Sequence, residues 1–185
     1  MLSRNEAINI LQRFLINDEN IKKSYAAEAI LKNIAKFLNK DQELWARVGL
    51  LHNIDYEMTK GDPEKRGVLA ETFLKDLLPD EGINAIKADN YIHTDYVPVT
   101  SLDRVTIATI SFLGLLFYIL KDFPDKSIKD INVPIFYDFY KNKEYAQQFQ
   151  RNRINIITNI GISIQDFFKI SLDSVKEISE KLENL

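Results

Sequence analysis

The sequence predicts an all-α protein, and three observations lead to that prediction. Apolar residues recur at intervals of three and four through most of the chain, and no segment shows sustained alternation of apolar and polar residues. Capping signals stand where several of these periodic segments begin. The connections between the segments are short, which favours packed antiparallel neighbours. We therefore expect a helical bundle with extra helices at its C-terminal end.

Three helices are expected in the first fifty residues. Ser3 and Glu6 have the spacing of a capping box for the first helix, and a second helix begins around Glu19. Asp41 is the expected N-cap of a third helix, which frays at or soon after Asn53.

Two shorter helices are expected next. Asp62 followed by Pro63 is a strong start signal, because proline is favoured at the first helical position. That helix would run to about Leu78, and Asp80 would open another that extends as far as Tyr91.

The most apolar stretch of the chain is residues 105–120, which is 16 residues long. A membrane-spanning helix needs roughly 20 apolar residues. This stretch is shorter and also contains threonine, serine and glycine. We interpret it as a buried central helix that has Ser101 as its N-cap and ends near Phe123.

The C-terminal third is expected to contain three helices. A short aromatic helix covers residues 135–140, and a longer one covers residues 145–160 and stops at Gly161. Ser163 with Asp166 caps a last amphipathic helix that continues to the C-terminus.

Composition excludes several function classes. The net charge of −3 with mixed signs provides no broad basic face for nucleic acid. The absence of cysteine excludes disulfides, thiolate nucleophiles and cysteine zinc sites. No P-loop, dinucleotide fingerprint or Gly-x-Ser-x-Gly elbow occurs. The polar N-terminus does not resemble a signal peptide, so we expect a cytoplasmic protein with no membrane partner.

Residues 50–57 read Leu-Leu-His-Asn-Ile-Asp-Tyr-Glu and resemble the His-Asp signature of the HD-domain metal-dependent phosphohydrolases. Other segments resemble family segments in the expected order: residues 22–29 the first histidine helix, 62–67 the His-Gly segment, 85–90 the Ala-His-Asn segment, and 105–120 the helix of the last aspartate. The resemblance implies one domain over residues 1–185. It would comprise an HD-like core over residues 1–123 and a helical extension over residues 124–185 packed on it.

The family's metal ligands are largely replaced in this chain. In the family, one histidine, the His-Asp pair and a distant aspartate hold one or two divalent metals, which acidify a bound water and stabilise phosphoryl charge. The resemblance places Lys23 at the first histidine and Asn53 at the aspartate of the pair, so that only His52 survives. The last aspartate falls at Ile110 or Ser111, depending on the register.

The remaining groups are a poor match to a divalent cation. A neutral imidazole and a neutral amide lack the charge to hold it, and a cation about 4 Å from Lys23 would be repelled by a few kcal/mol. We therefore expect no cofactor. Our hypothesis is that the Lys23 ammonium replaces the metal, close to His52 and satisfied by Asp55 or Asp89.

The leading functional hypothesis is a catalytically inactive HD-like protein whose vestigial pocket binds a phosphorylated small molecule or nucleotide. The pocket would comprise Lys23, His52, Asn53, Asp55, Arg66 and Asp89. Each also has a structural interpretation: His52 as a hydrogen-bonded core histidine, Lys23 as an exposed lysine, Asn53 as a helix end, Asp55 as a turn acid, and Arg66 as an ion-pair partner of Asp62 or Asp89.

Two alternatives belong to other classes. The first is an active phosphohydrolase that uses a divalent metal and displaced ligands, drawn from His52, Asp55, Asp89 and His93. Asp89 and His93 are four residues apart and would share a helix face. The second is a structural or partner-binding protein, in which the aromatic segment 135–149 is a docking or homo-oligomer surface.

Overall fold

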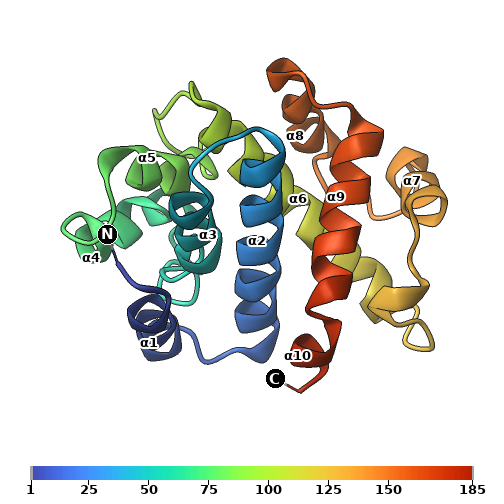
Figure 1. The fold of residues 1–185 in the computed structure, drawn as a ribbon, viewed down its shortest axis with the longest axis horizontal. Coiled ribbons are helices and arrows are strands. Elements are labelled where there is room, and N and C mark those ends of the chain that lie inside the picture. The colour runs from blue at the N-terminus through green and yellow to red at the C-terminus, as the bar shows by residue number, and fades with distance from the viewer. Residues whose placement is uncertain (1, 185) are drawn as a thin grey trace.

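The computed structural model describes residues 2–184, and within that range the chain forms α-helices and short 3-10 helices but no strand. The elements are α1 (Arg4–Phe14), α2 (Asp18–Phe37), α3 (Gln42–Leu51), η1 (Pro63–Lys65), α4 (Val68–Leu74), α5 (Asp80–Ala88), α6 (Ser101–Asp122), η2 (Ile128–Asp130), α7 (Val133–Lys141), α8 (Arg151–Asn155), η3 (Ile156–Ile160), α9 (Ile164–Glu177) and α10 (Ser179–Glu183). The all-α prediction is confirmed (Figure 1).

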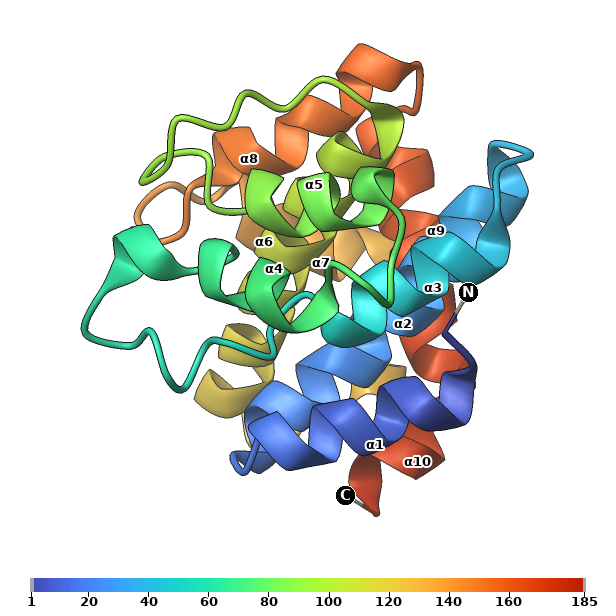
Figure 2. The same ribbon diagram turned by 90° about the vertical axis from the view of Figure 1, so that its left-hand side faces the viewer.

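Helices α2 and α3 form the most extensive contact between any two elements of the described chain. They lie side by side in both ribbon views (Figures 1 and 2). Gly49 on α3 lets the two backbones approach, because a Cβ there would lie 2.5 Å from the carbonyl oxygen of Ala27. The predicted caps of the first and third helices are present, namely the Ser3–Glu6 capping box and Asp41 as the N-cap of α3. Helix α2 begins at Asp18, one residue before the predicted start.

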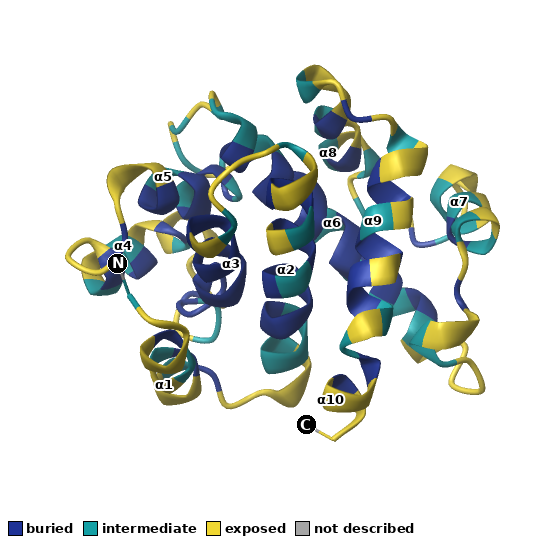
Figure 3. Ribbon diagram, in the orientation of Figure 1, coloured by how far each residue is buried: buried dark blue, intermediate teal, exposed yellow. Residues whose placement is uncertain are grey.

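Helix α6 lies at the centre of the fold and packs against α2, α5, α8 and η3. It is long and apolar enough to cross a membrane by length and composition alone, a test that core helices of soluble proteins also pass. Here most of its apolar side chains are buried against the neighbouring helices. Several turns of α6 are dark in Figure 3. The helix begins one residue earlier than predicted, with Thr100 as N-cap in a capping box with Asp103.

The C-terminal helices pack on this core through aromatic side chains. The fully buried ring of Phe112 on α6 lies 4.5 Å from Phe136 of α7, between ring centroids, and 5.8 and 5.9 Å from Phe167 and Phe168 of α9. The segment 135–149, predicted as a docking surface, therefore contributes Phe136 to the interior. Helix α9 also packs directly against α2.

Two helix predictions are wrong in extent. The helix expected to start at Pro63 is divided into η1 and α4 by Gly67, whose φ of +82° interrupts the helical path. The helix expected over residues 145–160 is reduced to α8 and η3. Arg151 explains the irregular stretch before α8, because its guanidinium donates hydrogen bonds to the carbonyls of Tyr140, Asn142 and Tyr145.

The other boundaries differ less. Helix α5 ends at Ala88 rather than continuing to Tyr91. Gly161 ends η3 in the left-handed conformation, and Ser163 caps α9, both as predicted. The last helix is interrupted at Ile178, so that α10 is a separate turn of helix.

Candidate functional site

Three of the predicted pocket residues lie around one cavity. Lys23 from α2, with His52 and Asn53 from the end of α3, lines a cavity of about 120 Å³ that α6 closes with Ile110, Leu113 and Gly114. Asn20 and Tyr56 complete its wall. Residues 22–29, 50–57 and 105–120 therefore converge in space, although they are far apart in the sequence.

The His52 ring has a defined tautomer. Its Nδ1 lies 2.7 Å from the carbonyl oxygen of Gly49, which can only accept, so Nδ1 carries a proton and donates it. Burial lowers the pKa of His52 and outweighs the opposing effects of this hydrogen bond and of the Asp89 charge. The ring is therefore neutral near pH 7, and Nε2 presents a lone pair as a hydrogen-bond acceptor.

The Lys23 ammonium is paired within its own helix. Its Nζ lies 2.5 Å from the Glu19 carboxylate, one turn earlier in α2, and 5.6 Å from the centroid of the Phe117 ring. The hypothesis that Asp55 or Asp89 satisfies this lysine is wrong. The reason is local, because side chains four apart on a helix lie on the same face. The ammonium remains at the edge of the cavity, a quarter exposed.

Asp55 has a structural role. Its carboxylate is completely buried and accepts hydrogen bonds from the backbone N–H groups of Gly67 (2.6 Å) and Ala70 (3.0 Å), at the start of α4. Burial raises the pKa of Asp55, and these two donors offset part of that rise. It does not line the cavity, so its assignment to the pocket is wrong.

Asp89 is bound by a cation that the sequence did not indicate. Arg153 of α8 donates to the Asp89 carboxylate, to the Asp89 carbonyl oxygen at 2.6 Å, and to the Ser111 hydroxyl at 3.1 Å. Both charged side chains are mostly buried. No local pattern marks Arg153, because it stands 64 residues after Asp89 and reaches it only through packing of the extension.

Arg66 lies behind the cavity wall. Its guanidinium stacks over the Tyr56 ring, 4.3 Å from the ring centroid, and it does not line the cavity itself. The two acids considered as its partners are engaged elsewhere, Asp62 with Lys65 and Asp89 with Arg153. Arg66 therefore fixes the orientation of Tyr56, and the prediction that it faces the pocket is wrong.

The donor set does not fit a divalent metal. Asp89 and His93 do not share a helix face, since α5 ends at Ala88. Within residues 2–184, no three histidine or acidic side chains are placed to hold an ion together. Around the cavity, His52 and Asn53 are neutral and Lys23 is cationic, a combination that hard divalent ions disfavour.

A second, wider cleft adjoins the cavity. It has a volume of about 430 Å³ and shares Asn20, Lys23 and Tyr56 with the inner cavity. Lys60 adds a second cation to its wall, and two acids also line it, Glu57 and the Glu19 that pairs with Lys23. Glu57 is occupied, because it accepts hydrogen bonds from the backbone N–H groups at the start of α2. Sequence reasoning missed Lys60, which stands in a turn with no motif around it.

Comparisons of the chain with protein-family models, with curated proteins and with solved structures found no match. The resemblance to HD domains therefore rests on the residues that carry it and stays a prediction. The structure adds one relevant fact, which is that the matching segments meet at the cavity around His52.

The lowered pKa of His52 predicts a pH-dependent stability. Below the ordinary histidine pKa of 6.5, the unfolded chain gains a proton at His52 that the folded chain resists, so stability falls as the pH falls. We expect urea denaturation to show a larger loss between about pH 7.5 and pH 5.5 in the wild type than in His52→Asn. Asparagine keeps a donor toward Gly49 without titrating. The raised pKa of Asp55 has the opposite effect, a stability that rises as the pH falls, but it contributes equally in both proteins. Identical dependence of stability on pH in the two proteins would contradict the prediction.

Proposed function

We propose that this chain is a non-catalytic, HD-like protein that binds a phosphorylated small molecule without a metal. One observation supports this best. The His52 and Asn53 side chains are more than nine-tenths buried and line the cavity, yet no hydrogen bond within residues 2–184 engages the His52 Nε2 or the Asn53 amide. Neither group is among the fully buried polar atoms that lack a partner in the described residues, so both reach the surface of the cavity and are free to bind a polar ligand.

The chemistry of the wall narrows the class of ligand. Neutral His52 accepts a hydrogen bond at Nε2, so it selects a hydroxyl or N–H donor. Lys23 supplies a cation, which favours an anionic group on the same ligand. Asn53 both donates and accepts. A sugar phosphate or a nucleotide carries hydroxyl donors and phosphate acceptors a few bonds apart.

The dimensions support a ligand that occupies both spaces. Pockets for drug-sized molecules are roughly 300–1,000 Å³, so the inner cavity of about 120 Å³ admits only a small group. The cleft of about 430 Å³ has room for the rest of the molecule. There the Tyr56 ring, backed by Arg66, offers a flat surface, and Lys60 offers a second phosphate contact.

The proposal is tested by thermal-shift measurements with nucleotides and sugar phosphates, each with and without a chelator. A ligand at 100 times its Kd adds about 2.7 kcal/mol to the free energy of unfolding. We expect at least one compound to raise the Tm equally with and without the chelator. Lys23→Gln, His52→Asn and Asn53→Ala should each abolish the shift.

Lys22→Gln is the matched control, because Lys22 precedes Lys23 on α2 but lines neither the inner cavity nor the cleft. It should keep the wild-type response. Binding that requires a divalent metal, or that survives both His52→Asn and Lys23→Gln, would overturn the proposal. Hydrolysis of a phosphoester by the wild type and not by His52→Asn would favour the phosphohydrolase instead.

A further inference from the structure

We propose a second ligand site, separate from the His52 cavity, that binds a phosphate-type dianion between α1, α2, α3 and α10. The site is a cavity of about 370 Å³ whose wall includes Arg4, Lys32, Arg47 and Lys181. It lies where the N-terminal helix approaches the C-terminal helix, and Figure 1 shows α1 and α10 near the same end of α2. It shares no residue with the cavity or the cleft around Lys23.

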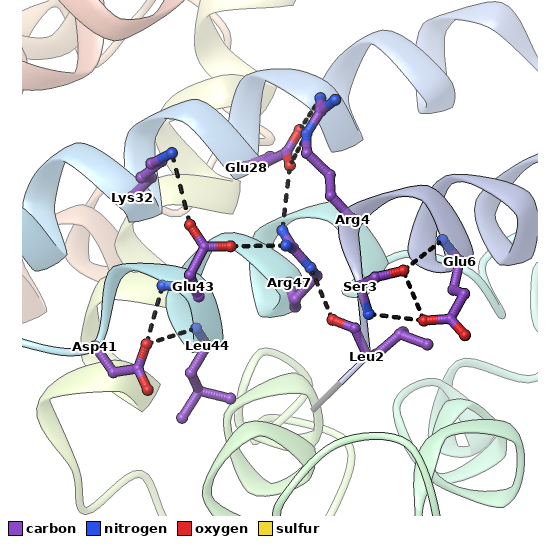
Figure 4. Close-up of polar contacts among 10 residues, drawn as sticks. All are labelled: Leu2, Ser3, Arg4, Glu6, Glu28, Lys32, Asp41, Glu43, Leu44 and Arg47. Atoms are coloured by element: carbon purple, nitrogen blue, oxygen red, sulfur yellow. Dashed lines mark hydrogen bonds and ion pairs between the residues drawn. The ribbon is translucent and has the colours of Figure 1, made fainter.

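Two of the three carboxylates of this wall, Glu28 and Glu43, are already shared between cations. Figure 4 shows Glu28 between Arg4 and Arg47: Arg4 holds both of its oxygens at 2.7 Å, and Arg47 lies 3.7 Å away. Glu43 likewise lies between Arg47, at 2.7 Å, and Lys32, at 3.7 Å. Three cations therefore share two carboxylates as ion-pair partners. Lys32 has no hydrogen bond of normal length in this network.

Lys181 adds a fourth cation with no acid of its own in the described part of the chain. Its ammonium lies over the ring of Tyr25, 3.3 Å from the ring centroid, and makes no ion pair within residues 2–184. Glu177 stands four residues earlier and also lines the cavity, but the interruption at Ile178 separates the two on the helix. Glu177 instead accepts from the amide of Asn33.

Electrostatics favour an anion at this position. Burial lowers the pKa of Lys181, and the nearby positive charge of Arg4 lowers it further, while the Glu28 carboxylate acts in the opposite direction without reversing the shift. An anion placed between these two side chains would relieve their repulsion and offer acceptors to both. The buried Tyr25, whose hydroxyl has no hydrogen bond within residues 2–184, supplies a further donor on the same wall.

The cavity volume is at the lower end of the range for small-molecule sites. It suits a free phosphate or a compact phosphomonoester. Since the ligand would join Arg4 of α1 to Lys181 of α10, it would connect the two ends of the described chain and stabilise the fold.

The test is titration with inorganic phosphate at constant ionic strength, read by calorimetry and by Tm. It is carried out on Lys23→Gln as the background, so that phosphate bound at the His52 cavity does not contribute. We expect saturable binding and a rise in Tm that sodium chloride of equal ionic strength does not produce. Lys181→Gln and Lys32→Gln should each weaken binding about tenfold or more, because each removes a charge-assisted contact.

Lys181→Arg should retain binding, because it keeps the charge. Lys169→Gln is the matched control, since Lys169 is an exposed lysine of α9 paired with Asp173 and lies outside this cavity. Arg4 is left intact because its removal would strand the buried Glu28 carboxylate. Absence of phosphate binding in the Lys23→Gln background, or binding unchanged by Lys181→Gln, would overturn this site without affecting the proposed function.

Discussion

Gly49→Ala is expected to destabilise the protein by about 3 kcal/mol or more, at or beyond the upper end of typical overpacking costs. The new Cβ would lie 2.5 Å from the Ala27 carbonyl oxygen and 2.7 Å from the Glu28 nitrogen. Both are backbone atoms of α2, so no side-chain rotation can relieve the clash. In an isolated helix alanine is favoured over glycine by about 1 kcal/mol, but this gain is smaller than the steric cost.

The same substitution should damage the site. The Gly49 carbonyl holds the His52 ring, and separation of α3 from α2 would move His52 away from Lys23. Chemical denaturation measures the stability, and loss of the ligand-induced Tm shift reports the site. Gly61→Ala is the control, because nothing lies within 4 Å of its added Cβ and its stability should change by less than about 1 kcal/mol. Equal effects at the two glycines would contradict the close approach of α2 and α3.

Arg153→Met is expected to cost about 2–4 kcal/mol. Removing one partner of a buried ion pair typically costs roughly 3–5 kcal/mol in the free energy of unfolding. The cost expected here is smaller, because the two side chains are 16% and 17% exposed and water screens part of their interaction. Methionine keeps much of the apolar stem but leaves the Asp89 carboxylate without its cation. It also removes the hydrogen bond to Ser111, which ties α8 to α6.

A double-mutant cycle separates the ion pair from packing. Asp89→Asn removes the charge that Arg153→Met strands, so the double variant should be less destabilised than the sum of the two single variants. Urea denaturation of the four proteins gives the coupling free energy. Strict additivity would mean that Asp89 and Arg153 do not interact, and that the C-terminal extension is held to α5 and α6 by apolar packing alone.

Much of the fold could be predicted because its signals are local. The Ser3–Glu6 box, the Asp41 cap and the glycine stop at Gly161 each depend on residues within one helical turn, and each is present. The aromatic segment after α6 was less predictable. Five carbonyls between residues 139 and 146 accept hydrogen bonds from the Arg151 side chain, and these bonds form only where the fold places Arg151 against this segment.

The candidate site divides in the same way. From the sequence alone, the resemblance to HD domains predicted that Lys23, His52 and Asn53 lie together, and all three line one cavity in the structure. Only the tertiary structure decided the partner of each charged group. Lys23 forms an ion pair with Glu19, and Asp89 forms one with Arg153. Asp55 accepts hydrogen bonds at the start of α4. The physical reason is that the energy of a charged group depends on distances of a few ångströms and on burial. Helix packing determines both of these, and residue type and spacing do not record them.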